Sequence, residues 1–417
     1  MDTSTSLAGP ERPAPCRARW IWWSGLGLFC LAGATGAFFR FKQTYGGLGL
    51  FSLGNVRHAH SHLMYMGWAT PVLMGLIWRL LPQPVARTYD RAFRATVGTT
   101  FAAALLCYPL FLLYGYTPVQ LGPVRMPVAA AASGLNILCW YAFVGLYIAG
   151  TRGRSRTGSI QFWDVSLAFL VLSTIGAWGV GVLHALDVHD PIWTTASIHF
   201  YLDLFSEGWF VLGLLGVMVA VLGPSPGRSL ARPLLLVACG LPASFLMVLP
   251  SAHLSVPIEL AGRLGGGLVG GGLLLIVARL GHRVRDTDTP WLWWIPLLAL
   301  GGKAIGQLAG ALVPKLWPSD VPGLRMLYLH LMLLGFVSMG LVAGARAVWN
   351  GVSDRGVATF YGAVGLVLGS LVLLVVPGGG GTRHVAAWAS LGPLLAAALV
   401  LIEGRLQHEE PLAQTEP

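Results

Sequence analysis

Three histidines stand at the start of an otherwise apolar segment of this 417-residue chain. They are His58, His60 and His62, and the stretch that follows them, LMYMGWATPVLMGLIW, contains no charged residue. Imidazole is a good ligand for iron, copper and zinc, and an ionisable group in a membrane span is by default a candidate functional residue. This segment therefore predicts metal or cofactor chemistry near one end of a membrane-spanning helix.

The pattern of this segment recurs towards the C-terminus. HSHLMYMGW, which begins at His60, and YLHLMLLGF, which begins at Tyr328, both contain His-Leu-Met, two further residues, glycine and an aromatic residue. Glycine beside a bulky ring suits the close approach of a flat ligand, and two helices that each present one imidazole can clamp a heme iron. His60 and His62 lie about 200° apart around a helix, so we expect only one of them to face His330.

A third segment combines an imidazole with two carboxylates. SIHFYLDLFSEGW places His199, Asp203 and Glu207 four residues apart, along one stripe of a helix. Carboxylates inside a span are costly, and an imidazole one turn from a carboxylate is the beginning of a non-heme iron or copper site. The stripe therefore predicts metal binding or proton transfer, and the alternative is a polar stripe that hydrogen-bonds to another span.

The composition shows which elements must position these residues. Hydrophobic residues make up 55% of the chain and charged residues 11%, whereas about a quarter of a soluble protein is charged. We therefore predict an all-α polytopic membrane protein, with one twelve-span domain at 20–404 between cytoplasmic tails at 1–19 and 405–417. The expected spans are 20–41, 58–82, 93–115, 126–149, 163–186, 194–222, 233–250, 255–281, 290–314, 323–349, 356–377 and 384–404.

The basic residues give these spans an orientation. Eighteen of the 27 arginines and lysines flank the spans on the side of the N-terminus, and basic residues concentrate on the cytoplasmic side of a membrane. Both termini are therefore expected in the cytoplasm, with the chain in the bacterial cytoplasmic membrane. Nine of the eleven histidines then fall near the outer face. The same bias explains the net charge of +10 without a nucleic-acid partner.

In motif and span order, the chain resembles the catalytic subunit of the heme–copper oxidase superfamily, and within it a divergent form of the nitric oxide reductase branch. That family has twelve spans, and histidines of spans two and ten hold its low-spin heme. The resemblance implies a heme b on His330 and either His60 or His62. Arg57 and Arg325 precede the two motifs, and each is expected to pair with a heme propionate or to lie exposed at the membrane interface.

The resemblance also implies a second metal beside a second, high-spin heme. The matching ligands for non-heme iron or copper are His199, Asp203 and His253, and the matching carboxylates of the centre are Glu207 and Glu259. The implied reaction is the reduction of NO or O2, with electrons supplied by a partner subunit or a quinone.

Two residues depart from the family at this second centre. Ala252 stands where the family has a histidine next to His253, and Tyr328 stands where it has the histidine of the high-spin heme. A tyrosinate can also bind heme iron, so the sequence leaves the number of hemes at one or two.

Two other functions stay open from the sequence. The chain also resembles the non-respiratory membrane proteins that contain heme and copper and relieve nitric oxide stress. Alternatively, a transporter or assembly factor would use the outer histidines to handle heme or copper without turnover.

Two basic residues, Arg263 and Lys303, fall inside predicted spans. Lys303 is expected to pair with a carboxylate or to line a proton path, because a lone charge in mid-span is costly.

Overall fold

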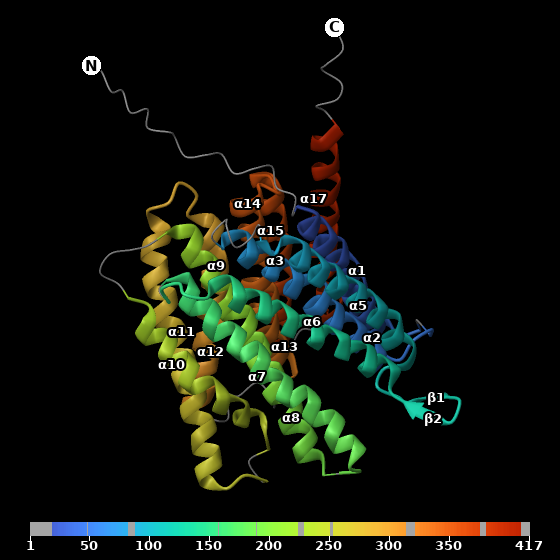
Figure 1. Cartoon of the computed structure of the whole chain (residues 1–417). Coiled ribbons are helices and arrows are strands. Elements are labelled where there is room, and N and C mark those ends of the chain that lie inside the picture. The colour runs from blue at the N-terminus through green and yellow to red at the C-terminus, as the bar shows by residue number, and fades with distance from the viewer. Residues whose placement is uncertain are drawn as a thin grey trace, which may run out of the picture.

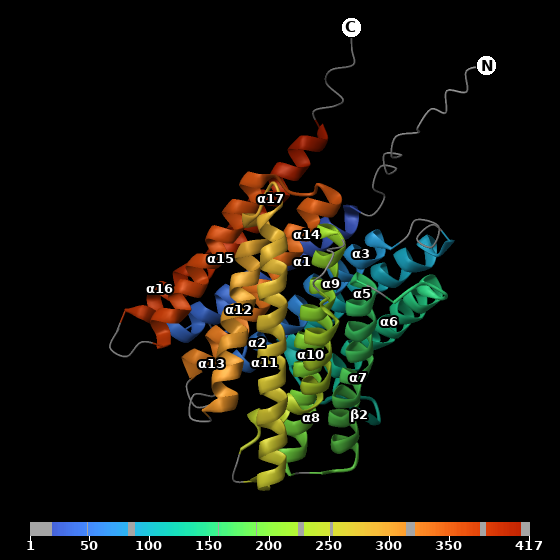
Figure 2. The same cartoon turned by 90° about the vertical axis from the view of Figure 1, so that its left-hand side faces the viewer.

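A computed structural model of the chain describes residues 19–47, 49–81, 88–156, 158–188, 190–223, 229–250, 253–313, 322–375 and 381–409. Nearly all of these residues are helical, and eleven of the helices are long and apolar enough to cross a membrane. The fold is thus an all-α polytopic membrane bundle, as predicted. The first helix begins and the last helix ends at the same end of the bundle (Figures 1 and 2), which fits an even number of crossings.

The described elements follow one another along the chain without a large soluble insertion. They are α1 (Arg19–Tyr45), α2 (Leu53–His62), η1 (Leu63–Ala69), α3 (Thr70–Leu80), α5 (Asp90–Tyr114), β1 (Val119–Leu121), β2 (Val124–Met126), α6 (Val128–Thr151), α7 (Ser159–Ala185), α8 (Pro191–Asp203), η2 (Leu204–Val211), α9 (Leu212–Leu222), α10 (Ala231–Ser244), η3 (Phe245–Val248), α11 (Val256–Arg285), α12 (Trp291–Leu312), α13 (Pro322–His330), η6 (Leu331–Ser338), α14 (Met339–Trp349), α15 (Asp354–Val375), α16 (Thr382–Ala389) and α17 (Leu391–Glu409).

The second predicted span is one continuous helical stretch over residues 53–80, formed by α2, η1 and α3. Three histidines and two arginines make it less apolar than the other eleven. It begins at Leu53, earlier than the predicted residue 58, because the Ser52 side chain caps the helix by accepting a hydrogen bond from the Asn55 amide. The histidines therefore lie in the second and third turns of a helix rather than at its first residue.

Three helical stretches form the centre of the bundle: 53–80, 191–222 and 322–349. α3, α9 and α14 contact one another, and η2 contacts η6. In its most apolar window, Pro191–Leu222 is 89% buried, whereas most of the other spans are only 33–44% buried. The peripheral helices instead expose large apolar side chains, as expected of lipid-facing surfaces; they include Leu105, Leu138, Ile175, Leu298 and Leu366.

Each central stretch changes from α-helix to π-helix at the same point of its sequence pattern. The π-helical segments η1, η2 and η6 begin directly after His62, Asp203 and His330. DLFSEGW is therefore a third copy of the motif, which the sequence comparison missed because aspartate replaces the histidine. π-Helical turns are rare and concentrate at functional sites. The repeat therefore predicts a functional site at the centre of the bundle.

The repeated glycines allow these helices to pack closely. A Cβ atom at Gly208 would lie 2.4 Å from the Phe169 Cβ, and one at Gly335 would lie 2.8 Å from the Ala299 Cβ. At Gly67 the nearest atoms belong to Leu28 and to Leu63 of the same segment. In the structure these glycines admit neighbouring side chains, which differs from the expectation that they face a flat ligand.

One small element was not predicted. β1 and β2 pair antiparallel, with Val119 opposite Met126, and the turn contains Gly122 at a φ of +59°. This hairpin projects from the bundle between α5 and α6 (Figure 1). It follows Tyr116, which contacts His58 and His62 of α2.

Candidate functional site

His60 and His330 lie close enough for a charge on one ring to act on the other, although 270 residues separate them. Each ring is held by a hydrogen bond to a backbone carbonyl. The Nδ1 of His60 lies 2.8 Å from the Ala32 oxygen, and the Nδ1 of His330 lies 2.8 Å from the Met326 oxygen. In each case the carbonyl can only accept, so Nδ1 carries the proton and Nε2 keeps a lone pair that can bind a metal.

Arg40 of α1 accompanies this histidine pair. Its guanidinium contacts the Met326 sulfur, and its charge acts on both His60 and His330. Arg40 falls near the end of the predicted span 20–41, and α1 continues past it to Tyr45. The signal available in the sequence was an arginine within the aromatic run AFFRF.

His62 is directed away from this pair. Its ring stacks on Phe111 of α5 at 3.8 Å between centroids, and its Nε2 lies 3.4 Å from the Tyr116 hydroxyl. Two residues of helix turn the side chain by about 200°, which explains why His60 and His62 have different neighbours. The sequence left the choice between His60 and His62 open, and in the structure His60 is the one whose ring lies within electrostatic reach of His330.

A second group of predicted residues lines a cavity of about 90 Å³. This volume accommodates several water molecules or a small gas molecule. The cavity lies against α8 and η2, and its walls also come from η1, α10, η3, α12, α13 and η6. The lining residues are Tyr65, His199, Leu202, Asp203, Ser206, Glu207, Ser244, Val248, Gln307, Arg325, Tyr328, Leu329 and Met332.

The predicted stripe of α8 and η2 faces this cavity with all three of its polar residues, His199, Asp203 and Glu207. Arg325, an exposed residue of α13, also lines it, and its charge acts on His199 and on Asp203. The cavity thus combines an imidazole, two carboxylates and a guanidinium between membrane spans. Such a set of groups can bind and release protons or hold a cation.

A buried ion pair closes one side of the cavity. Lys303 Nζ lies 2.6 Å from the Glu207 Oε2 and donates a hydrogen bond of 2.6 Å to the Gln307 Oε1. Gln307 in turn donates to Glu207 at 3.4 Å, and the Lys303 ammonium lies 5.3 Å from the centre of the Tyr328 ring. The expectation that Lys303 pairs with a carboxylate is confirmed.

Several predicted site residues lie elsewhere. His253 and Arg57 are exposed, and Glu259 is in the first turn of α11; none of the three lines the cavity. Ala252 lies outside the described residues. Among the described residues, no group of three or more histidines, cysteines and carboxylates is close enough to hold a metal ion. The structure therefore brings His199 to Asp203 but does not bring His253 to them.

Arg263, the other basic residue inside a span, caps a neighbouring helix. Its Nε and one terminal nitrogen donate to the carbonyl oxygens of Ala311 and Leu312 at the end of α12. These bonds satisfy carbonyls that the helix itself leaves without a partner, so Arg263 has a structural role.

Fold and site together define an all-α integral membrane protein with two polar sites among its central spans. No family model matches the chain, and no curated protein matches it.

Proposed function

We propose that this chain is an integral membrane heme protein that holds one low-spin b-type heme between His60 and His330 and carries electrons through it. The observation that carries the proposal is that His60 and His330, from different central spans, lie within electrostatic reach of each other and that each has its Nδ1 fixed on a carbonyl. His60 and His330 would hold the heme iron through Nε2, because both Nε2 atoms keep their lone pairs. The heme supplies the exchange of single electrons.

Arg40 is the residue best placed to neutralise a heme carboxylate. Its charge acts on both imidazoles, whereas Arg57 is exposed and Arg325 lines the other cavity. An arginine forms strong, charge-assisted hydrogen bonds with a carboxylate. In this proposal Arg40 takes the role that the resemblance gave to Arg57 and Arg325.

The residues around Tyr328 do not fit a second heme. The Lys303 ammonium lies over the Tyr328 ring, and Glu207 and Gln307 engage the same ammonium. A heme on Tyr328 would have to displace a buried ion pair, which would leave uncompensated charges inside the membrane. The proposal is therefore one heme per chain.

Reduction of NO or O2 is a second candidate function, which the cavity favours. His199 and Asp203 offer an imidazole and a carboxylate to a non-heme iron or copper ion, and Asp203 and Glu207 can hold protons for a reaction that consumes them. Electrons would come from a partner subunit or a quinone. The other candidates, a non-respiratory protein of nitric oxide stress and a heme or copper carrier, need no turnover at this cavity.

A count of hemes and a turnover assay test these proposals on the purified protein. One b-type heme per chain with a low-spin spectrum supports the electron-carrying protein. Consumption of NO or O2 by the reduced sample supports the reductase. A sample that binds one heme but consumes neither gas supports the electron-carrying protein, and the non-respiratory protein and the carrier share that outcome. A protein that takes up no heme in heme-supplemented cells would contradict the proposal.

A further inference from the structure

Two of the three histidines of α2 remain without a role in the heme proposal, and they form a cluster with Tyr116. His58 and His62 are four residues apart and therefore share one face of the helix. Their ring centroids lie 6.5 Å apart, and the centre of the Tyr116 ring is 4.7 Å from that of His58. The cluster thus joins two imidazoles and one phenol at the end of a membrane span.

The His62 ring is oriented so that its free nitrogen faces this cluster. Its Nδ1 lies 2.9 Å from the His58 carbonyl oxygen, which can only accept, so Nδ1 carries the proton. The stack on Phe111 holds the plane of the ring. Nε2 therefore presents its lone pair towards the Tyr116 hydroxyl, and a carbonyl partner of this kind is typical of metal-binding histidines.

The spacing of His62 and Tyr116 suits two ligands of one metal ion. Their N···O separation of 3.4 Å is that of a long hydrogen bond, in which the Tyr116 hydroxyl donates to the free Nε2. Two ligands, each about 2.0–2.1 Å from a metal, are about 3.3 Å apart at the tetrahedral positions of Zn²⁺ and about 2.9 Å apart at neighbouring tetragonal positions of Cu²⁺. The observed spacing therefore suits zinc directly and copper after an approach of about 0.5 Å. His58 is half-buried, and rotation of its side chain would bring its imidazole to the same metal ion as a third ligand.

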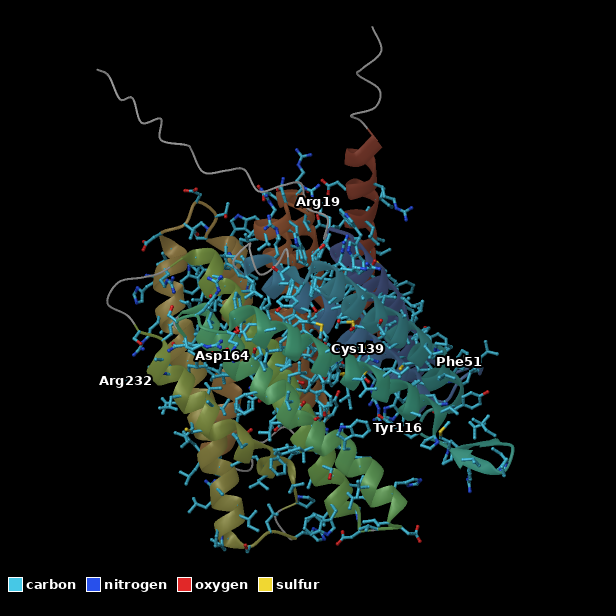
Figure 3. The ribbon with its side chains drawn as sticks, in the orientation of Figure 1. Arg19, Phe51, Tyr116, Cys139, Asp164 and Arg232 are labelled. Atoms are coloured by element: carbon cyan, nitrogen blue, oxygen red, sulfur yellow. The ribbon has the colours of Figure 1, made fainter. Side chains whose placement is uncertain are left out.

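The cluster is held firmly and can be reached from solvent. Asn55 donates hydrogen bonds of 3.2 Å to the Leu112 and Leu113 carbonyls, which ties the start of α2 to the end of α5. Gly115, at a φ of +56°, then turns the chain into Tyr116. Tyr116 is 49% exposed, and Figure 3 shows it near the base of the hairpin, away from the end at which Arg19 lies.

We propose that His58, His62 and Tyr116 form a solvent-accessible site for a divalent late transition metal ion, with Cu²⁺ bound most tightly. Imidazole nitrogen suits copper and zinc, and sites of this kind bind Cu²⁺ more tightly than the other divalent ions of the first row. A free phenol has a pKa of about 10, so the two imidazoles are the main ligands at neutral pH and Tyr116 releases its proton to water when it binds as phenolate. The site is independent of the proposed heme.

Titration of the full-length protein with CuCl₂, in detergent and without a histidine tag, tests this site. We expect one tight equivalent per chain, with nitrogen hyperfine splitting in the Cu²⁺ electron paramagnetic resonance spectrum. Loss of a residue that only orients a ligand weakens a metal site about 10–100-fold, so loss of a ligand itself in His58→Ala should raise the dissociation constant at least about tenfold. Tyr116→Phe should weaken binding less, and ZnCl₂ should compete.

His384→Ala is the matched control, because His384 is an exposed histidine whose ring lies 5.0 Å from the Tyr45 ring without a second imidazole. It should bind Cu²⁺ as the unaltered protein does. The far-ultraviolet circular dichroism and the elution volume of each variant show that it is folded. Unchanged Cu²⁺ affinity in folded His58→Ala, or equal loss in His384→Ala, would overturn the proposal.

Discussion

Lys303 of α12 and Glu207 of η2 form an ion pair of 2.6 Å in which the lysine side chain is fully buried and the glutamate is 6% exposed. Charges buried to this degree between membrane spans are costly unless they are paired. The pair joins the central stretch 191–222 to α12 and forms one wall of the cavity.

Lys303→Met is expected to destabilise the protein strongly, because it leaves the Glu207 carboxylate without its counter-charge. Removing one partner of a buried pair costs about 3–5 kcal/mol. Thermal unfolding in detergent measures the loss, and Lys303→Met/Glu207→Gln should recover most of it. The matched control is Asp354→Asn, which breaks the partly exposed pair with Arg346 at 2.8 Å and should cost much less. Equal losses from both pairs would contradict the account.

Gly208→Ala is expected to disturb the packing of η2 on α7. The new Cβ would lie 2.4 Å from the Phe169 Cβ, and over-packing of this kind costs about 1–3 kcal/mol. Gly271→Ala in α11 is the control, because no atom lies within 4 Å of its Cβ position, and there alanine should be neutral or slightly stabilising. The same thermal assay measures both. A Gly208→Ala variant as stable as Gly271→Ala would show that the close contact is unimportant.

Arg40→Gln is expected to lower the midpoint potential of the proposed heme. A positive charge stabilises the reduced heme, which carries one positive charge fewer than the oxidised form, so its removal favours oxidation. We expect a shift of tens of millivolts in a redox titration, since a tenfold change in a one-electron equilibrium is about 59 mV. Arg57→Gln should shift the potential much less, because Arg57 is exposed and its charge is screened. A larger shift of the potential from Arg57→Gln than from Arg40→Gln would show that Arg57, and not Arg40, neutralises the heme carboxylate.

The architecture could be predicted from the sequence because membrane spans follow from apolar length alone. The stretch 194–222 was expected and Pro191–Leu222 is observed. The neighbours of Arg40 could not be predicted in this way, because hydropathy places Arg40 in the span 20–41 without showing which other helix its side chain meets. The packing of α1 against α13 brings the Arg40 side chain to Met326, four residues before His330.

The lining of the cavity was partly predictable, because the helical stretch 191–222 supplies more of the lining residues than any other stretch. His199, Asp203 and Glu207 share a stripe, and helical periodicity alone brings them to one face. The choice between His60 and His62 was different, since it depends on how α2 is rotated against α1, α5 and α13. His253 was placed by resemblance only, and the structure leaves it exposed after the short η3 turn.

The central claim is that His60 and His330 together hold a low-spin heme. Reduced-minus-oxidised absorption spectra of His60→Ala, His62→Ala and His330→Ala, compared at equal amounts of folded protein, test it most directly. We predict that His60→Ala and His330→Ala lose the low-spin b-type spectrum and that His62→Ala retains it, because the His62 ring packs on Phe111. A spectrum that survives His60→Ala but disappears in His62→Ala would contradict the account.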